Sequence, residues 1–283
     1  MTEMDRVEEL AVHAKNIRAT ALTMAYRCGS NAHLGGGLSE IEALTVLYGD
    51  VMNAADLSLP DDRRDKFILS KGHGVLGLYA VLHEFGVLSD EKLSTFMQNG
   101  SDLIAHPVMK PELGLESSSG SLGQGISMAV GLALAAKKRN YSYNTYVLCG
   151  NGECNEGSVW EACMSAVNFG LDNFTLFIDN NHMQSDGASE GIMNISNRYS
   201  DMLKAIGFQT TEVDGNDVGA LYKAFHEPHR SGFPKAIVGN TVKGYGISFM
   251  ENNNDWHHNR LTQQQYLSAM EELGVPVATE AGA

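Results

Sequence analysis

In the first half of the chain, apolar residues recur mainly at the spacing of a helix. The first thirty residues predict one long amphipathic helix that ends near Gly29. A second helix is expected shortly after it, with Ser39 as its cap and Glu42 three residues further on. The positions that recur along the first helix are Leu10, Ala14, Ile17, Ala21 and Met24.

In the middle of the chain, residues 66–74 are a short apolar run that ends in a turn, and residues 75–85 predict a helix. Residues 100–119 show no periodicity and predict a loop, and residues 120–139 predict a helix of small residues. From Thr145 onward the pattern becomes regular. Strands are predicted at 145–149, 174–179, 209–213 and 235–240, and helices at about 156–169, 197–206, 217–229 and 262–273. This alternation predicts an α/β fold, a parallel sheet with helices on both faces. No internal repeat or low-complexity linker interrupts it, so we expect one domain over residues 1–283.

Charge and composition restrict the class of partner. The 20 Lys and Arg residues stand against 34 Asp and Glu, giving a net charge of −14 that disfavours nucleic acid and anionic membrane surfaces. No apolar run approaches the roughly 20 residues of a membrane span. The acidic start is unlike a secretory signal, and the four cysteines show no metal-binding spacing. These features predict a cytoplasmic protein.

Two successive predicted strands end in polar sequence, "GNGE" at 150–153 and "DNNH" at 179–182. In an open parallel sheet, ligands bind beyond the carboxyl ends of the strands. If these strands are neighbours, their ends lie about 5 Å apart, and Asn151 and Asn181 could hold one hard cation such as Mg²⁺. The two glycines would let the backbone approach a diphosphate. Taken alone, however, the Asn-Asn pair is more typical of a turn than of a cation site.

Five motifs in order resemble the transketolase family. "GNGE" followed by "NN" resembles the family's thiamine diphosphate motif, and "NAHLGGGLS" and "FILSKGHG" resemble its first two histidine segments. "ESSSGSLGQG" is similar to its cofactor loop, and "TVKGYGISFMENNNDWHH" to the segment with its last active-site histidine. The resemblance covers residues 10–262 and only the diphosphate-binding domain of the family.

The resemblance implies an enzyme that binds thiamine diphosphate with Mg²⁺, for which Ca²⁺ or Mn²⁺ can substitute. Its reaction would transfer a two-carbon ketol unit from a ketose, phosphorylated or related, to an aldose. The family's pyrimidine-binding and C-terminal domains are expected on a separate partner subunit, which would supply the catalytic glutamate. We expect two copies of each chain, and no activity from this chain alone.

The resemblance also implies site residues. The catalytic histidines would be His33, His73, His106 and His257. Cofactor contacts are expected from His73, Gly120, Ser121, Leu122, Gly150, Asn151, Gly152, Glu153, Asn181 and His257. The cation would be held by the side chains of Asn151 and Asn181 and by the backbone carbonyl of Met183. His258 is the alternative to His257, and Glu156 is either an interface residue or a solvated helix acid.

Two positions depart from the family pattern. Asn151 stands where the family has an aspartate, which removes one negative charge from the cation site, and Ser121 replaces a proline. A scaffold that has lost metal binding is therefore one alternative. Another is a different thiamine-dependent subunit, of the deoxyxylulose-phosphate synthase or 2-oxo-acid dehydrogenase type. The set of four histidines favours ketose chemistry, because imidazoles suit proton transfer to sugar hydroxyls.

Overall fold

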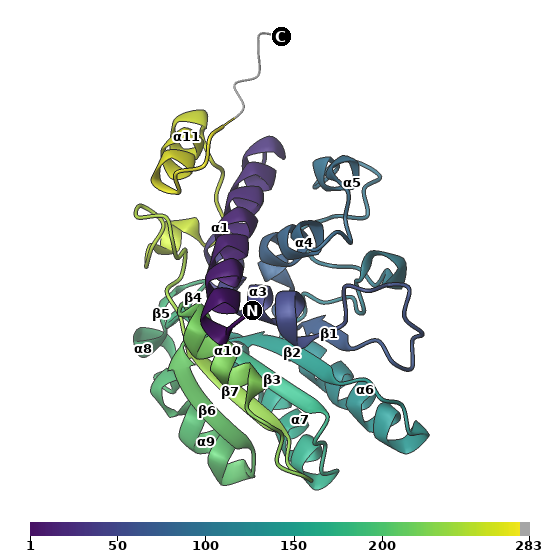
Figure 1. Cartoon of the computed structure of the whole chain (residues 1–283). Coiled ribbons are helices and arrows are strands. Elements are labelled where there is room, and N and C mark those ends of the chain that lie inside the picture. Colours follow the sequence, from purple (N-terminus) through teal and green to yellow (C-terminus); the bar gives the residue numbers. More distant parts are fainter. Residues whose placement is uncertain (278–283) are drawn as a thin grey trace.

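The computed structural model describes residues 1–277. At its centre is a five-stranded sheet in the order β1-β2-β3-β7-β6, in which every neighbouring pair is parallel (Figure 1). The strands are β1 (Lys66–Leu69), β2 (Thr145–Gly150), β3 (Phe174–Asn180), β6 (Gln209–Asp214) and β7 (Lys235–Asn240). The predicted parallel sheet is confirmed, and the short apolar run at 66–74 supplies its edge strand.

Helices cover both faces of the sheet (Figure 1). One face packs against α1 (Glu3–Arg27), α3 (Ile41–Val46), α4 (Val75–Glu84) and α10 (Val218–His226). The other face packs against α6 (Gly125–Arg139), α7 (Gly157–Asn168) and α9 (Tyr199–Ile206). The long predicted N-terminal helix is confirmed as α1, and the predicted helices of the second half differ from the observed ones by a few residues at their ends.

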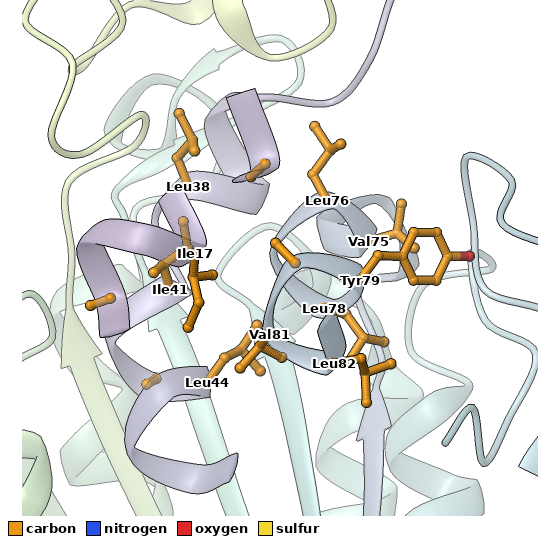
Figure 2. Close-up of a cluster of buried hydrophobic side chains, with 14 of the residues drawn as sticks. Ile17, Leu38, Ile41, Leu44, Val75, Leu76, Leu78, Tyr79, Val81 and Leu82 are labelled. Carbon is orange, nitrogen blue, oxygen red and sulfur yellow. The ribbon is translucent and has the colours of Figure 1, made fainter. Parts of the chain in front are cut away.

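The two cores explain why apolar residues predominate in the central strands. Successive side chains of a strand point to opposite faces. Phe67 and Leu69 therefore join the core under α1, α3 and α4, whereas Ile68 joins the core under α6 and α7. A strand covered on both faces is therefore apolar at most positions, with a few buried polar exceptions such as Thr145, Thr175 and Lys235. In the first core, Figure 2 shows Leu44 of α3 and Val81 of α4 meeting between their helices.

Ser39 does not cap the second helix, so that prediction is wrong. It follows a short helix, α2 (Gly35–Leu38), and its hydroxyl donates to the Gly36 carbonyl (3.2 Å) and to Asp179 Oδ2 (2.6 Å). The Ser39 hydroxyl therefore bonds to the buried Asp179 carboxylate and does not cap the second helix. Glu42 is also used elsewhere, because its Oε1 accepts from Arg18 at 2.6 Å.

The remaining elements are short. Residues 100–119 form a loop with one 3₁₀ turn (Pro111–Leu113), after α5 (Asp90–Ser94). A hairpin of β4 (Met183–Gln184) and β5 (Gly187–Ala188) leads into α8 (Ser189–Ile192), and α11 (Gln263–Glu272) matches the last predicted helix. Between residues 1 and 277 no helix has the length and apolar character to span a membrane.

Candidate cofactor site and active site

The carboxyl ends of β2 and β3 bring the two candidate ligand segments together. The strands are direct neighbours, with Gly150 opposite Asp179, and the Asn151 N–H donates to the Asp179 carbonyl at 3.0 Å. Asn151 and Asn181 then line the same cavity, which has a volume of about 210 Å³. The predicted adjacency of the two strand ends is therefore confirmed.

Most of the predicted site residues line this cavity. They are His33, His73, His106, Gly120, Leu122, Gly150, Asn151, Gly152, Glu153, Asn181, Met183 and His257. Ser121 does not line it and is exposed, so the structure does not support a side-chain contact from that position. His258 is exposed as well and lies outside the lining, which favours His257 as the cavity histidine.

A larger cavity of about 510 Å³ lies elsewhere, between α1, α5 and α11. Its walls are mostly uncharged, and it is lined by none of the strand ends. We place the functional site in the smaller cavity because that one combines strand termini, glycines, histidines and lysines.

The two asparagines are held by their amide nitrogens. Asn151 Nδ2 donates to Ser189 Oγ at 2.7 Å, and within residues 1–277 its Oδ1 accepts no hydrogen bond. Asn181 Nδ2 donates to Asp179 Oδ2 (3.2 Å) and Ser39 Oγ (3.3 Å), while its Oδ1 accepts from the Met183 N–H (3.1 Å). A carbonyl oxygen has two lone pairs, so both amide oxygens keep acceptor capacity.

The glycines leave room at the cavity wall. Gly120 has φ +142°, and a Cβ there would lie 3.0 Å from the Cδ2 atom of His106. The Gly152 N–H donates to no group within residues 1–277 and is free for an anion. The Gly150 N–H is already used, because it donates to Glu153 Oε2 at 3.2 Å. Gly150 instead makes space beside Lys71, whose Cδ would lie 3.2 Å from a Cβ.

Glu153 fastens the loops around the cavity. Its Oε1 accepts from the Ser70 hydroxyl (2.5 Å) and the Gly123 N–H (2.8 Å), in addition to the bond from Gly150. Burial raises the pKa of this carboxyl, and the hydrogen bonds oppose that rise. Its observed contacts are thus with the protein, where it holds the glycine-rich turn in place.

Four histidines line the cavity with His33 in the centre, and a fifth, His258, packs against His33 from outside the lining. The centre of its ring lies 5.5 Å from that of His73, 5.6 Å from those of His106 and His257, and 4.4 Å from that of His258. Burial lowers the pKa of His33 to about 3 and that of His257 to about 4, and it also lowers those of His73 and His106. At neutral pH these four rings are uncharged, each with one N–H donor and one acceptor nitrogen.

Two buried lysines line the cavity that were not predicted as site residues from the sequence. Lys71 Nζ lies 2.5 Å from Asp179 Oδ2, 2.8 Å from Glu40 Oε2 and 2.7 Å from the Gly36 carbonyl. Burial lowers the pKa of Lys71, but the attraction of Asp179 and Glu40 outweighs it and keeps the lysine charged. Burial raises the pKa of Glu40 to about 8, against the pull of Lys71.

Lys243 is the second of these lysines and also lines the cavity. Its Nζ donates to Asn254 Oδ1 (2.8 Å) and to the Gln184 carbonyl (3.1 Å), and burial together with repulsion from Lys71 lowers its pKa to about 8. Both lysines stand inside motifs noted in the sequence, "SKGHG" and "TVKGYG", which is the signal that could have revealed them.

Comparison with known proteins identifies the family. The model of a family described as "Transketolase, thiamine diphosphate binding domain" matches residues 9–280. The chain belongs to the transketolase family.

Curated transketolase relatives match almost end to end. The chain is 37% identical over 266 residues to an apulose-4-phosphate transketolase subunit of Actinobacillus succinogenes, covering 94% of this chain and 96% of the relative. It is also 37% identical over 242 residues to the 6-deoxy-6-sulfo-D-fructose transketolase subunit SqwG of a Clostridium species, covering 85% and 88% of the two chains. The chain is accordingly a thiamine diphosphate-binding, N-terminal subunit of transketolase type, a transferase.

Solved transketolases share the fold. The enzyme of Leishmania mexicana superimposes with a TM-score of 0.84 at 30% identity, over 94% of this chain and 41% of the solved one. That of Campylobacter jejuni gives 0.83 at 29% identity, over 97% and 43%. The thiamine diphosphate-binding fold predicted from the sequence is confirmed, and the chain spans about two-fifths of these transketolases.

Proposed function

We propose that the chain holds thiamine diphosphate through a divalent cation and takes part in transferring a two-carbon ketol unit from a ketose to an aldose. The observation that carries the proposal is the meeting of Asn151, Asn181 and the histidine cluster in one cavity at the carboxyl ends of adjacent parallel strands.

The residues present fit the cofactor. The proposed cation ligands are Asn151 Oδ1, Asn181 Oδ1 and the Met183 carbonyl, all oxygens of the kind that Mg²⁺, Ca²⁺ or Mn²⁺ accepts. The diphosphate would meet the free N–H of Gly152 and the charge of Lys243, whereas the charge of Lys71 is balanced by the carboxyl groups that enclose it. These local groups offset the net charge of −14, which would otherwise repel the anion.

When bound, thiamine diphosphate supplies the carbanion chemistry that breaks the C2–C3 bond of a ketose. The neutral rings of His33, His73, His106 and His257 would orient the sugar hydroxyls and move their protons, since each ring offers both a donor and an acceptor. Gly120 and Leu122 would contact the aminopyrimidine from the loop before α6.

The names of the relatives support the choice of substrate and partner. One relative is named for a sugar phosphate and the other for a sulfonated sugar, so we propose a ketose donor with an anionic substituent. Because these relatives are called subunits, we propose a separate partner chain that carries the pyrimidine-binding and C-terminal domains and supplies the catalytic glutamate. Two copies of each chain, one domain over 1–283, and a cytoplasmic location complete the proposal.

The test is reconstitution. The purified chain is mixed with its partner subunit, thiamine diphosphate and Mg²⁺, and ketol transfer is measured over a panel of ketose phosphates and sulfonates. Turnover is expected only from the mixture. Robust turnover by the single chain would refute the dependence on a partner.

The replacement of the family aspartate by Asn151 favours one alternative, a scaffold without a metal site. Binding of the cofactor to the folded state should raise the melting temperature in proportion to RT ln(1 + [L]/Kd). A titration of thiamine diphosphate with and without Mg²⁺, in the presence of the partner, distinguishes the two functions. If Mg²⁺ makes no difference to the melting temperature, the scaffold is the better description.

A further inference from the structure

Ser189 connects both segments that carry the proposed cation ligands. It is the first residue of α8, and its side chain is buried. Its Oγ accepts from Asn151 Nδ2 at 2.7 Å, on the segment that follows β2. Its backbone N–H donates to the carbonyl of His182 at 2.9 Å, and His182 stands between Asn181 and Met183. One residue thus fastens the ends of both strands.

An asparagine at a cation site has a problem of orientation that an aspartate does not have. Either oxygen of a carboxylate can face a cation, whereas an amide has one oxygen and one NH₂ group of opposite polarity. If the amide turned over, its N–H donors would point at the cation. The hydrogen bond to Ser189 Oγ fixes the position of Asn151 Nδ2 and leaves Oδ1 without a hydrogen-bond partner within residues 1–277.

The main chain at position 151 is fixed independently. The hydroxyl of Tyr199 donates to the Asn151 carbonyl at 2.8 Å, and the Asn151 N–H donates to the Asp179 carbonyl. What these bonds leave open is the rotation of the amide at the end of the side chain. A second amide, Gln184 Nε2, lies 3.5 Å from Ser189 Oγ, so the hydroxyl oxygen faces donors from two directions. Ser189 is therefore placed as an acceptor.

We propose that Ser189 is a positioning residue that lets an asparagine serve at position 151 of the cation site, by holding the amide oxygen toward the cavity. The proposal rests on the proposed function, because it assumes a divalent cation beside Asn151 and Asn181. Groups that orient a metal ligand typically change metal affinity 10- to 100-fold when they are removed. We expect a loss of about 10-fold for Ser189→Ala.

The experiment measures the binding of Mn²⁺ directly. The complex of the chain with its partner is saturated with thiamine diphosphate, and free Mn²⁺ is followed by its electron paramagnetic resonance signal. Ser189→Ala removes the hydroxyl but keeps the backbone N–H that holds His182. Ser200→Ala is the matched control, since Ser200 is a buried serine whose hydroxyl has no partner within residues 1–277. Ser189→Ala should raise the Kd for Mn²⁺ about 10-fold, and Ser200→Ala should leave it unchanged.

Combining Ser189→Ala with Asn151→Asp shows whether the loss of Mn²⁺ affinity comes from a misoriented amide or from general disruption of the site. Either oxygen of the Asp side chain can face the cation, so Ser189→Ala should change the Kd for Mn²⁺ little when residue 151 is an aspartate. An equal loss in both backgrounds, or no loss in either, would overturn the proposal for Ser189 while the wild-type protein still binds Mn²⁺. If the wild-type complex binds no Mn²⁺ at all, the cation site and the role of Ser189 fall together. Melting temperatures without metal show whether each variant is folded.

Discussion

Gly120→Ala is the perturbation whose effect on the site can be worked out most directly. Gly120 has φ +142°, a conformation that residues with a Cβ rarely adopt. A Cβ there would also lie 3.0 Å from Cδ2 and 3.3 Å from Cγ of His106, so the imidazole must give way by a few tenths of an ångström. The change therefore combines backbone strain with displacement of a cavity histidine.

The two effects can be separated with Gly232→Ala, at a position outside the site. Gly232 has φ +79°, but no heavy atom lies within 4 Å of a Cβ built on it. Each variant should lose about 2 kcal/mol of stability from backbone strain, which lowers the melting temperature by roughly 4–8 °C for a chain of this size. Only Gly120→Ala should disturb catalysis. A displacement of about 1 Å can cost 10²-fold in rate, and a smaller shift of His106 should cost about 10-fold in kcat/KM.

The assay is ketol transfer by the reconstituted enzyme at saturating thiamine diphosphate, with melting temperatures for both variants. Gly232→Ala should keep kcat/KM within about twofold of wild type. If the two variants lose equal activity, the contact with His106 is not the cause. If Gly120→Ala is fully active, the Gly120–His106 contact has no bearing on catalysis.

Three further predictions concern charge. Lys71→Met leaves the buried Asp179 carboxylate and the neighbouring Glu40 carboxyl group without the lysine cation, and it should cost about 3–5 kcal/mol of stability in urea unfolding. Lys137→Met breaks an ion pair that is more exposed, and a larger loss for it than for Lys71→Met would contradict this prediction. Glu40 has its pKa raised to about 8, so its contribution to stability is present below its unfolded pKa and is lost as pH rises through about 8. The free energy of unfolding of the wild-type protein should fall between about pH 4.5 and about pH 8, and that of Glu40→Gln should fall less. Identical slopes for the two proteins would count against a raised pKa of Glu40. The pKa of His33 is lowered to about 3, so its ring resonances in an NMR titration should not shift between pH 8 and 5, which a midpoint near 6 would disprove.

The sequence predicts the sheet well because its strands are covered on both faces. A short, mostly apolar run such as Phe174 to Ile178, rich in aromatic and β-branched residues and bounded by polar turns, favours a buried strand. The motifs are located correctly for a related reason, since glycines and asparagines directly after a buried strand must lie at the edge of the sheet. Adjacency of β2 and β3 then brings Asn151 and Asn181 to one cavity.

What sequence reasoning misses depends on contacts between distant segments. The sequence predicts Ser39 as a helix cap, but Asp179, 140 positions away, takes its hydroxyl. Lys71 stands in the "SKGHG" motif, but the motif does not reveal its ion pairs, because a lysine in a turn is normally solvated. Only the fold shows that Glu40 and Asp179 enclose it. Ser189 likewise has no distinguishing sequence pattern, and only the β4–β5 hairpin places it beside Asn151.

The charges around the cavity bear on whether the proposed cation site can tolerate an asparagine at position 151. Lys71 is neutralised by the carboxylates that enclose it, so its charge adds little net attraction for an incoming anion. An aspartate at 151 would attract a dication and repel a diphosphate, and both forces are strong in a site of low dielectric. Asn151 removes both. The dication and the diphosphate must then supply each other's counter-charge, so each should bind weakly alone and tightly together. Isothermal titration of Mg²⁺ with and without thiamine diphosphate measures this coupling, and equal affinities under the two conditions would contradict it.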